Sequence, residues 1–411
     1  YQTNTFGAQN FDLNLSGKLA KKTYFTLSTY QNFDPGSMNL KFTNYIDRAQ
    51  FYTAGLTHLF NDDRGRFSVF YKYNETHPLT ALANYAPFTY DGDGKVSELK
   101  NFRMGRDSYL PVDGMMQYRN VKTGELVTDN LYDIIKTRTH EATALLDYDL
   151  GNNLSLAVKG KFSHSKGHSG DQLTMGFYED ADATYADNGD AFHGTIQRRL
   201  SQINAFCVKD AMLVAELQKK TASHDWAFGI NELYSNIDYA RSTTQYYHEV
   251  APNPRKLIYN GVEYANLNGS TEYDKGFENK LAAYVNDTWR VSRNFRMGYG
   301  ARVELFNLGV DYIGDKRFSD FHIGANYTDA EGNKKTVGIT HHTNTGLNYA
   351  VSVSPTYNIT HNFGLTGEIN FLRQYRHLEA YSGTSLPYYN NRPFILGRAG
   401  IFFNSSFVNL V

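Results

Sequence analysis

The feature that most constrains this chain is a strict alternation of apolar and polar residues over long stretches. Between 295 and 305, apolar side chains occupy every second position, and polar residues or glycine stand between them. The same pattern runs through 138–149, 154–165 and 344–359. Because successive side chains of a β-strand point to opposite faces, each stretch is predicted to be a strand with one apolar and one polar face.

The predicted strands are unusually long. Strands of globular proteins usually have about 5–6 residues, whereas a tilted strand that crosses a bilayer needs about 9–11. Most of the strands predicted here fall in the longer class. The thirteen predicted segments are 9–19, 22–32, 48–60, 66–77, 138–149, 154–165, 204–219, 224–239, 276–291, 295–310, 344–359, 363–376 and 396–407.

The connections between these segments alternate in length. Short turns are expected at 20–22, 61–65, 151–153, 223–225, 292–294 and 360–362. Long connections are expected at 33–47, 77–137, 166–203, 240–275, 311–343 and 378–394. Outer-membrane barrels combine short periplasmic turns with longer extracellular loops, while soluble domains rarely contain so many loops above about 15 residues. The pattern predicts an all-β fold, a transmembrane antiparallel up-and-down β-barrel.

The strand count predicts that this barrel is incomplete. Barrels made from one bacterial chain normally have an even number of strands, so thirteen strands do not close. The chain also ends at Leu410 and Val411, without the terminal aromatic residue common in outer-membrane proteins. We therefore expect 1–411 to be part of a single barrel domain.

The composition fits a barrel and excludes other classes. Aromatic residues make up 15% of the chain, with 32 Tyr and 27 Phe, although the mean hydropathy is only −0.52. A net charge of −1 argues against nucleic acid as a partner. No apolar run of about 18 residues predicts a transmembrane helix, and the single cysteine, Cys207, excludes an intrachain disulfide.

One hairpin carries a resemblance to a known family. The segment 281–304 reads LAAYVNDTWRVSRNFRMGYGARVE. It resembles the mid-barrel hairpin of TonB-dependent outer-membrane transporters, in which an AAYVQDTW strand, a short turn and a GxRxE strand follow one another. Asn286 replaces the usual Gln. The segments 64–73 and 105–111 resemble parts of such receptors from Bacteroidota. The matching hairpin residues are Ala282, Ala283, Tyr284, Val285, Asp287, Thr288, Trp289, Gly300, Arg302 and Glu304.

The resemblance implies a parent protein with a 22-stranded barrel, an N-terminal plug and a TonB box. Neither the plug nor the TonB box is visible in this sequence. About one strand would precede Phe11 and about eight would follow Leu410. The implied function is import of a scarce solute across the bacterial outer membrane, energised through TonB. That solute would be a glycan, a peptide, a siderophore, haem or a similar molecule. The implied partners are the TonB complex, outer-membrane lipids and a surface lipoprotein.

Two other functions remain open from the sequence. The first is a passive outer-membrane diffusion channel, for which the complete gene would encode no plug. The second is a surface adhesin or assembly component whose long loops bind another protein. A plug encoded upstream of Tyr1 would favour the energised importer.

The predicted ligand contacts lie in or beside two of the long connections, 240–275 and 378–394. Tyr rings stack on flat ligands at a low entropy cost, and Arg offers a forked donor to a carboxylate or phosphate. An aromatic girdle followed by an ordinary loop is the alternative. The candidate residues are Arg241, Tyr246, Tyr247, His248, Tyr388, Tyr389, Asn390 and Arg392.

Trp289 stands beside the predicted turn at 292–294, where a membrane–water interface would lie, so we predict that it is an interface anchor. Arg302 and Glu304 share one face of their strand, as do Lys159 and Lys161. Charges in register belong on a wet inner wall, because a charge at the lipid midplane costs roughly 2–4 kcal/mol.

Metal sites and catalytic sites are not expected, and no cofactor is predicted. Loop carboxylates such as Asp91, Asp182 and Asp187 have Ca²⁺ chemistry, but 91–94 lacks the twelve-residue loop of a calcium site and reads as a turn. His224 is expected to be a solvated turn residue. The pairs His164/His168 and His341/His342 have the chemistry of metal or haem ligands, but no Cys or carboxylate lies at a recognisable metal-ligand spacing around them. The chain has no HExxH, GxSxG or Walker motif, so it is not predicted to be an enzyme.

Overall fold

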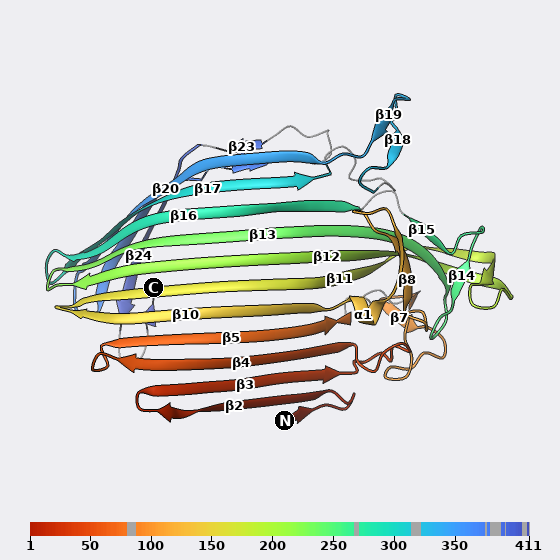
Figure 1. Cartoon of the computed structure of the whole chain (residues 1–411), viewed down its shortest axis with the longest axis horizontal. Coiled ribbons are helices and arrows are strands. Elements are labelled where there is room, and N and C mark those ends of the chain that lie inside the picture. Colours follow the sequence, from red (N-terminus) through yellow and green to blue (C-terminus); the bar gives the residue numbers. More distant parts are fainter. Residues whose placement is uncertain are drawn as a thin grey trace.

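The long strands form one continuous antiparallel sheet. A computed structural model describes the chain except residues 80–87, 267–270, 314–321, 375, 379–387, 391, 405–408 and 411. Within the described part, each of thirteen long strands pairs with the next one along the chain (Figure 1). The strands are β2 (Gln9–Ala20), β3 (Thr23–Asp34), β4 (Asp47–Phe60), β5 (Gly65–Pro78), β10 (Thr137–Gly151), β11 (Leu154–Tyr185), β12 (Ala191–Lys220), β13 (His224–Glu249), β16 (Glu272–Arg290), β17 (Phe295–Tyr312), β20 (Thr340–Asn358), β21 (Phe363–Arg373) and β24 (Phe394–Asn404).

The sheet confirms the predicted fold class. The predicted strand segments coincide with these strands, and the predicted short turns lie together at one end of the sheet (Figure 1). The long connections lie at the opposite end. The sheet is strongly curved, so that it continues past β17 and β20 at the top of this view and β24 lies behind the middle strands. An up-and-down sheet of this size and curvature is the architecture of a barrel wall.

Two predicted loops are wrong in their extent. The segments 166–203 and 240–275 were expected to be connections, but β11, β12 and β13 continue into them and reach 32, 30 and 26 residues. Strands of this length project well beyond the roughly 9–11 residues that cross a bilayer. The three strands therefore have a half near the short turns and an extension among the long connections.

The remaining elements are short and lie mostly among the long connections. They are α1 (Leu131–Ile134) and the strands β1 (Gln2–Thr3), β6 (Phe88–Gly92), β7 (Lys95–Glu98), β8 (Met115–Arg119), β9 (Leu126–Asn130), β14 (Lys256–Ile258), β15 (Tyr264–Asn266), β18 (Asn326–Thr328), β19 (Lys334–Thr336), β22 (Arg376–Leu378), β23 (Tyr388–Asn390) and β25 (Asn409–Leu410).

The two faces of the sheet differ in chemistry. Residues paired across antiparallel strands share a face, so Val303, which pairs with Tyr349, lies on one face and its neighbour Arg302 lies on the other. The first face, the apolar face, carries large side chains that stay uncovered: Val303 is 49% exposed and Val351 is 46% exposed. The opposite face, the polar face, carries the ion pairs. This alternation suits a wall with lipid on one side and water on the other.

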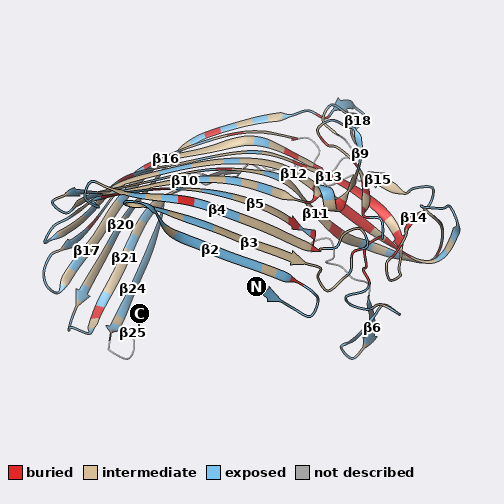
Figure 2. Cartoon of the chain, turned by 60° about the horizontal axis from the view of Figure 1, so that its bottom comes forward, coloured by how far each residue is buried: buried red, intermediate tan, exposed pale blue. Residues whose placement is uncertain are grey.

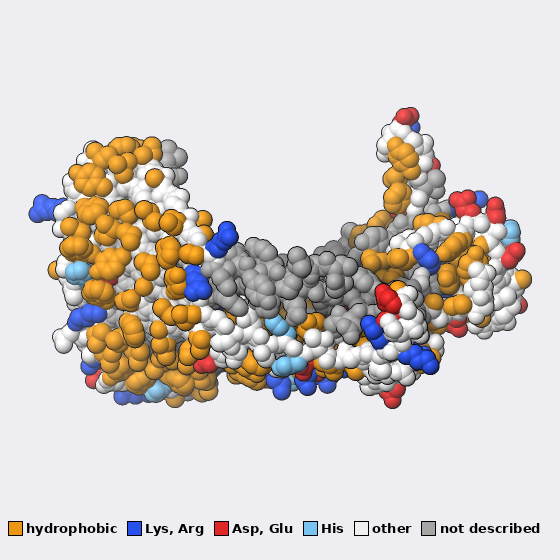
Figure 3. Space-filling model, turned by 90° about the horizontal axis from the view of Figure 1, so that it is seen from above, with side chains coloured by type: hydrophobic (Ala, Val, Ile, Leu, Met, Phe, Trp, Pro, Cys, Tyr) orange, Lys and Arg blue, Asp and Glu red, His pale blue; other side chains and the backbone are white. Residues whose placement is uncertain are grey.

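The buried residues gather at the loop end. In Figure 2 the buried positions lie chiefly along the extensions of β11–β13, whereas the half near the short turns is exposed or intermediate. Seen from above, hydrophobic side chains dominate the short-turn end, and charged side chains are more frequent around the loops (Figure 3). The largest buried cluster joins the 79–135 connection to β12 and β13 through Leu79, Met116, Ile135, Ile203 and Tyr246.

Candidate ligand-binding surface

The polar face carries a wall of paired charges at the level of the short-turn half. Glu304 accepts from Arg302 Nη2 at 2.7 Å and from Asn348 Nδ2 at 3.1 Å. On a distant part of the same face, Glu141 pairs with Lys72 at 3.1 Å and with Lys161 at 2.7 Å. Charges that are matched in this way, and that stay partly accessible, keep the wall wet without large net charge.

Two adjoining hollows lie on this wall. One has a volume of about 330 Å³ and is lined by Tyr284, Asn286, Ser352 and other side chains. The other has a volume of about 220 Å³, and Arg302 borders both. Hydroxyl, amide and guanidinium groups line them, so the hollows suit polar groups that lie against the wall.

Above the wall, the polar face of the extensions carries a tyrosine cluster. The ring centroids of Tyr178 and Tyr259 lie 5.2 Å apart, those of Tyr247 and Tyr259 lie 5.4 Å apart, and those of Tyr178 and Tyr247 lie 6.4 Å apart. Strands β11 and β13 and the turn after β14 bring these rings together. The Arg198 guanidinium lies 5.9 Å from the centre of the Tyr178 ring. All three rings are only partly buried, so part of each remains open to a ligand.

A second aromatic pair flanks this cluster toward the tip of the β11–β12 hairpin. The rings of Tyr185 and Phe192 meet edge to face at 5.5 Å, and the Arg255 guanidinium lies 3.8 Å from the centre of the Tyr185 ring. Arg255 also pairs with Asp187, and its hydrogen bonds hold the pKa of that carboxyl below its usual range. Burial, followed by the hydrogen bond to Glu249, raises the pKa of the Tyr185 hydroxyl, which stays neutral and donates to Glu249 Oε2 at 3.0 Å.

Of the four residues predicted in β13, two lie on the polar face. Arg241 pairs with Glu272 at 2.5 Å, and Tyr247 belongs to the tyrosine cluster. Burial raises the pKa of the Tyr247 hydroxyl. Ligand contact by these two side chains stays a prediction.

The other two predicted residues of β13 lie on the opposite face, because the alternation of the strand turns them away. Tyr246 and His248 are each 1% exposed. The Tyr246 hydroxyl donates to Gln172 Oε1 at 2.7 Å, and His248 Nδ1 donates to the Glu249 carbonyl at 2.7 Å. Both side chains are therefore occupied by the protein interior, and a solute does not reach them in this arrangement.

The candidates near the C-terminus are less fully described. Tyr388, Tyr389 and Asn390 form β23, which pairs with β22, but their side chains lie outside the described residues. Arg392 follows β23 and is exposed. Their contact with a ligand stays a prediction.

The predicted interface anchor belongs to a larger aromatic group. Trp289 lies beside the turn between β16 and β17 and is 41% exposed on the apolar face. His224 lies between Trp226 and Trp289, with ring centroids 5.6 and 5.8 Å away. The expectation that His224 is a solvated turn residue is wrong, because its Nδ1 also lies 2.7 Å from Asp287 Oδ2. The anchoring role of Trp289 stays a prediction.

The loop carboxylates and histidines that were considered as metal ligands from the sequence have other partners. Asp182 pairs with His193 at 2.9 Å, and His341 pairs with Asp311 at 2.6 Å. His164 Nε2 lies 3.4 Å from Cys207 Sγ. Among the described residues, no group of three or more His, Cys, Asp or Glu side chains is arranged to hold a metal ion.

Sequence reasoning missed Tyr178, Tyr259 and Arg198. All three lie in segments that were expected to be loops. Gln197 and Arg198 of β12 face His248 and Tyr247 of β13 in the sheet. The available signal was the aromatic content of the 173–178 stretch, but β-bulges after Thr174 and after Tyr178 break its alternation.

Comparisons with known proteins address the fold. No family model matches the sequence, and no curated protein matches it. Among solved structures, the ferric-catecholate import receptor Fiu of Escherichia coli K12 in its open form has a TM-score of 0.54 at 12% identity, over 90% of this chain and 53% of that one. The ferric yersiniabactin uptake receptor FyuA of Yersinia pestis has a TM-score of 0.54 at 11% identity, over 98% and 51%.

A third structure agrees with these two. The siderophore receptor PiuA of Acinetobacter baumannii has a TM-score of 0.50 at 13% identity and covers 90% of this chain. The chain spans about half the length of the receptors that it matches. No helix in the described residues is long and apolar enough to cross a membrane. The likeness shows that the chain has the fold of the barrel wall of outer-membrane receptors, the fold that the 281–304 hairpin implied.

Proposed function

We propose that this chain forms part of the barrel of an outer-membrane receptor that imports a scarce polar solute. The observation that carries the proposal is the continuous polar face, with its paired charges at one level and its tyrosine cluster above them. A channel needs a wet wall, and a receptor needs a recognition surface at its mouth. One face of the sheet supplies both.

The orientation follows from the fold. The short turns would face the periplasm and the long connections the exterior, as in other barrels of this type. Cysteines placed at Asp182 and Asn362, in a Cys207→Ser background, test this in intact cells. We expect an impermeant maleimide to label position 182 and not position 362. Labelling of both positions from outside would contradict the orientation.

The ligand chemistry that fits the tyrosine cluster is a polar molecule with at least one flat face. Tyr178, Tyr247 and Tyr259 offer ring faces, and Arg198 offers donors for a carboxylate, a phosphate or a hydroxyl-rich ring. Glycans, peptides and siderophores share these features. We infer that the predicted contacts Arg241 and Tyr247, and the loop residues Tyr388, Tyr389, Asn390 and Arg392, contribute to the same recognition surface.

Energisation through TonB is the finer part of the proposal. It is supported by the resemblance of 281–304 to TonB-dependent transporters and by the barrel fold. A bacteroidal origin is supported by the resemblance of 64–73 and 105–111 alone. The proposed partners are the TonB complex, outer-membrane lipids and a surface lipoprotein, and the proposed location is the bacterial outer membrane.

Uptake measurements on the complete gene test the function. Labelled ferric siderophores, oligosaccharides and peptides would be offered to cells with and without TonB. We expect one class to enter only when TonB is present, and to enter more slowly when Tyr178 and Tyr247 are changed to alanine. The matched control is Tyr90→Ala, a tyrosine of β6 that is 66% exposed and far from the cluster in sequence. Equal entry with and without TonB would contradict the energised importer and would favour a passive channel.

A further inference from the structure

A row of basic side chains marks the upper limit of the apolar face on three neighbouring strands. His140 of β10 pairs in register with His164 of β11, which pairs with Lys209 of β12. One row nearer the loops, Arg138 pairs with Lys166. We call these five residues the basic patch. The row below it on the same face is apolar and consists of Ala142, Phe162 and Ala211.

The patch carries more positive charge than its neighbours neutralise. Arg138 pairs with Glu75 at 2.6 Å, and His140 Nδ1 lies 2.6 Å from the Tyr71 hydroxyl. Lys166 and Lys209 are exposed, and neither has a salt bridge to any described residue. Two ammonium groups thus stand at the edge of the apolar face with no carboxylate partner among the residues described.

The patch is local rather than a general property of this boundary. On β13, β16 and β17, the first polar side chains above the apolar face are Glu232, Asn279 and Asn307, which are acidic or neutral. Asn279 Nδ2 donates to Glu232 Oε1 at 3.1 Å, so this part of the boundary is satisfied by its own hydrogen bonds. Among the six strands compared, β10–β12 therefore offer an anionic partner the more favourable position.

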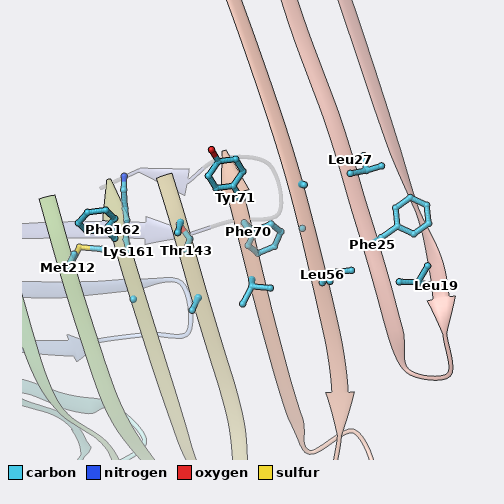
Figure 4. Close-up of a pocket in the computed structure, with 16 residues that line it drawn as sticks. Leu19, Phe25, Leu27, Leu56, Phe70, Tyr71, Thr143, Lys161, Phe162 and Met212 are labelled. Carbon is cyan, nitrogen blue, oxygen red and sulfur yellow. The ribbon is translucent and has the colours of Figure 1, made fainter. Parts of the chain in front are cut away.

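A broad apolar trough of about 940 Å³ lies directly below the patch. Figure 4 shows its side chains spread over the strands from β2 to β12. Two residues of the row below the patch line the trough, and the ring of Tyr71 lines it while the Tyr71 hydroxyl reaches His140. Apolar-face residues that line the trough are Leu27, Leu56, Val69, Tyr71, Ala142 and Phe162.

We propose that the basic patch and the trough together bind a phosphorylated glycolipid of the outer leaflet. Its phosphates would lie on Lys166, Lys209 and Arg138, and its acyl chains would fill the trough. Lysine ammonium groups reach the headgroup level while their methylene stems stay on apolar surface, and phosphate accepts charge-assisted hydrogen bonds from them. A trough that crosses seven strands, each about 4.8 Å from the next, accommodates several chains side by side.

The proposal goes beyond solute transport and depends only on the membrane orientation given above. A neutral phospholipid would leave the two lysines without a counter-charge. A protein partner would have no acyl chains to fill the trough. The charge of the patch and the apolar width of the trough select a lipid that is both anionic and rich in acyl chains.

The test uses the full-length protein extracted from outer membranes in detergent. Native mass spectrometry would compare adducts with added diphosphorylated lipid A and with added phosphatidylethanolamine. We expect lipid A to bind in preference, and we expect the variant K166E/K209E to lose at least about tenfold in lipid A affinity. The matched control K95E/K334E makes the same charge change on two exposed loop lysines and is expected to bind as the unchanged protein does.

Three results would overturn the proposal: unchanged lipid A affinity in K166E/K209E, equal adducts with phosphatidylethanolamine, or displacement of lipid A by inorganic phosphate alone. The last result would assign the patch to free phosphate instead of a lipid. If the charge-reversed variant does not assemble, K166Q/K209Q replaces it, with an expected loss of a few-fold. Phe162→Ala tests the trough separately, and a loss of lipid A affinity is expected there without a change in the phosphate contacts.

Discussion

The apolar face of β13 meets two different environments along one strand. Near the short turns, Phe228 and Ile230 are 56% and 43% exposed. In the extension, Tyr246 and His248 stand on the same face and are each 1% exposed. The alternation of the strand is unbroken between the two halves, so what differs is the material that covers the face.

The covering in the extension is the 105–136 part of a long connection. It is fastened to the turn after β13 by hydrogen bonds: Ser108 N donates to Asn253 Oδ1 at 3.0 Å, and Asn253 N donates to the Ser108 carbonyl at 2.8 Å. Protein offers hydrogen-bond partners to the polar groups that it buries, whereas the hydrocarbon of a lipid offers none. This explains why the covered half contains Gln172, Arg199 and Tyr246. The uncovered half near the short turns contains Phe, Ile, Leu and Val; the proposed function places it in the membrane, and we call it the lipid-level half.

The largest effect expected from this comparison is at two adjacent tyrosines on opposite faces. Tyr246→Ala leaves a cavity beneath the docked loop and removes the donor to Gln172, which should lower the stability of the extension by roughly 3–5 kcal/mol. Tyr247→Ala removes a partly exposed ring of the polar face and should cost about 1 kcal/mol. Hydrogen exchange of 105–136 measures both. Equal protection in the two variants would mean that the loop does not depend on the covered face.

The second prediction concerns adjacent positions in the lipid-level half. Val351 lies on the apolar face, and Ser352 lines a hollow of the polar face. Val351→Arg should destabilise the inserted barrel by roughly 2–4 kcal/mol, because a charge at the bilayer midplane has no counterpart in lipid. Ser352→Arg should cost under about 1 kcal/mol because the polar face is wet. Denaturant unfolding from vesicles measures both. The assignment of the faces fails if the two variants are equally stable.

The sequence was sufficient to predict the strands of the lipid-level half, but it did not predict that three of them continue into the extension. This difference has a physical reason. A strand that faces lipid needs an apolar side chain at every second position. The sequence from Phe295 to Leu305 has this pattern. In the extension both faces are partly covered by protein, so polar residues such as Gln172 and Gln197 stand at buried positions. The alternation in hydrophobicity then disappears although the strand continues.

The candidate site shows the same limit. Tyr246 and Tyr247 were both predicted because tyrosine and arginine in this segment suit a polar ligand with a flat face, and only the alternation of a strand separates them. That alternation could not be applied, since 240–275 was expected to be a loop. Tyr178 reaches the cluster from β11, and its partner rings arrive from β13 and the turn after β14, a convergence that depends on pairing across distant segments.

The third prediction uses pH to separate the two halves. Burial, and then the nearby Arg199, lower the pKa of His248 to about 3. The unfolded chain takes up a proton near pH 6.5, whereas the folded extension does not, so its stability falls as pH drops below about 6.5. At pH 5 the loss should be about 2 kcal/mol. Hydrogen exchange of 105–136 at pH 7 and pH 5 measures this loss.

The His248→Gln variant is the control for that measurement, since it keeps a polar side chain of similar size and cannot titrate in this range. We expect the pH dependence of loop protection to be largely removed in this variant. The lipid-level half should keep its stability over the same interval. A pH dependence that survives the substitution would assign the effect to other groups of the loop.

The smallest effect expected is at two asparagines that share a left-handed backbone and differ in their partners. Asn253 has a φ of 55° and Asn260 a φ of 52°. Changing either to alanine costs roughly 1 kcal/mol in backbone conformation. Only Asn253 also uses its side chain in docking, because Nδ2 donates to Asp107 Oδ1 at 2.7 Å and Oδ1 accepts from Ser108. Asn260 has no side-chain hydrogen bond in the described part of the chain.

The difference between Asn253→Ala and Asn260→Ala should therefore report the docking bonds alone, about 1–2 kcal/mol. The side-chain hydrogen bond of Arg106 holds the pKa of the Asp107 carboxyl well below its usual range. A depressed pKa gives stability that is present above about pH 4 and is lost only in stronger acid, so the difference should be the same at pH 7 and pH 5. Limited proteolysis of 105–112 at both values measures it. A difference that vanished at pH 5 would contradict the assignment of the difference to the Asp107–Asn253 contact, because that carboxyl stays ionised at both values.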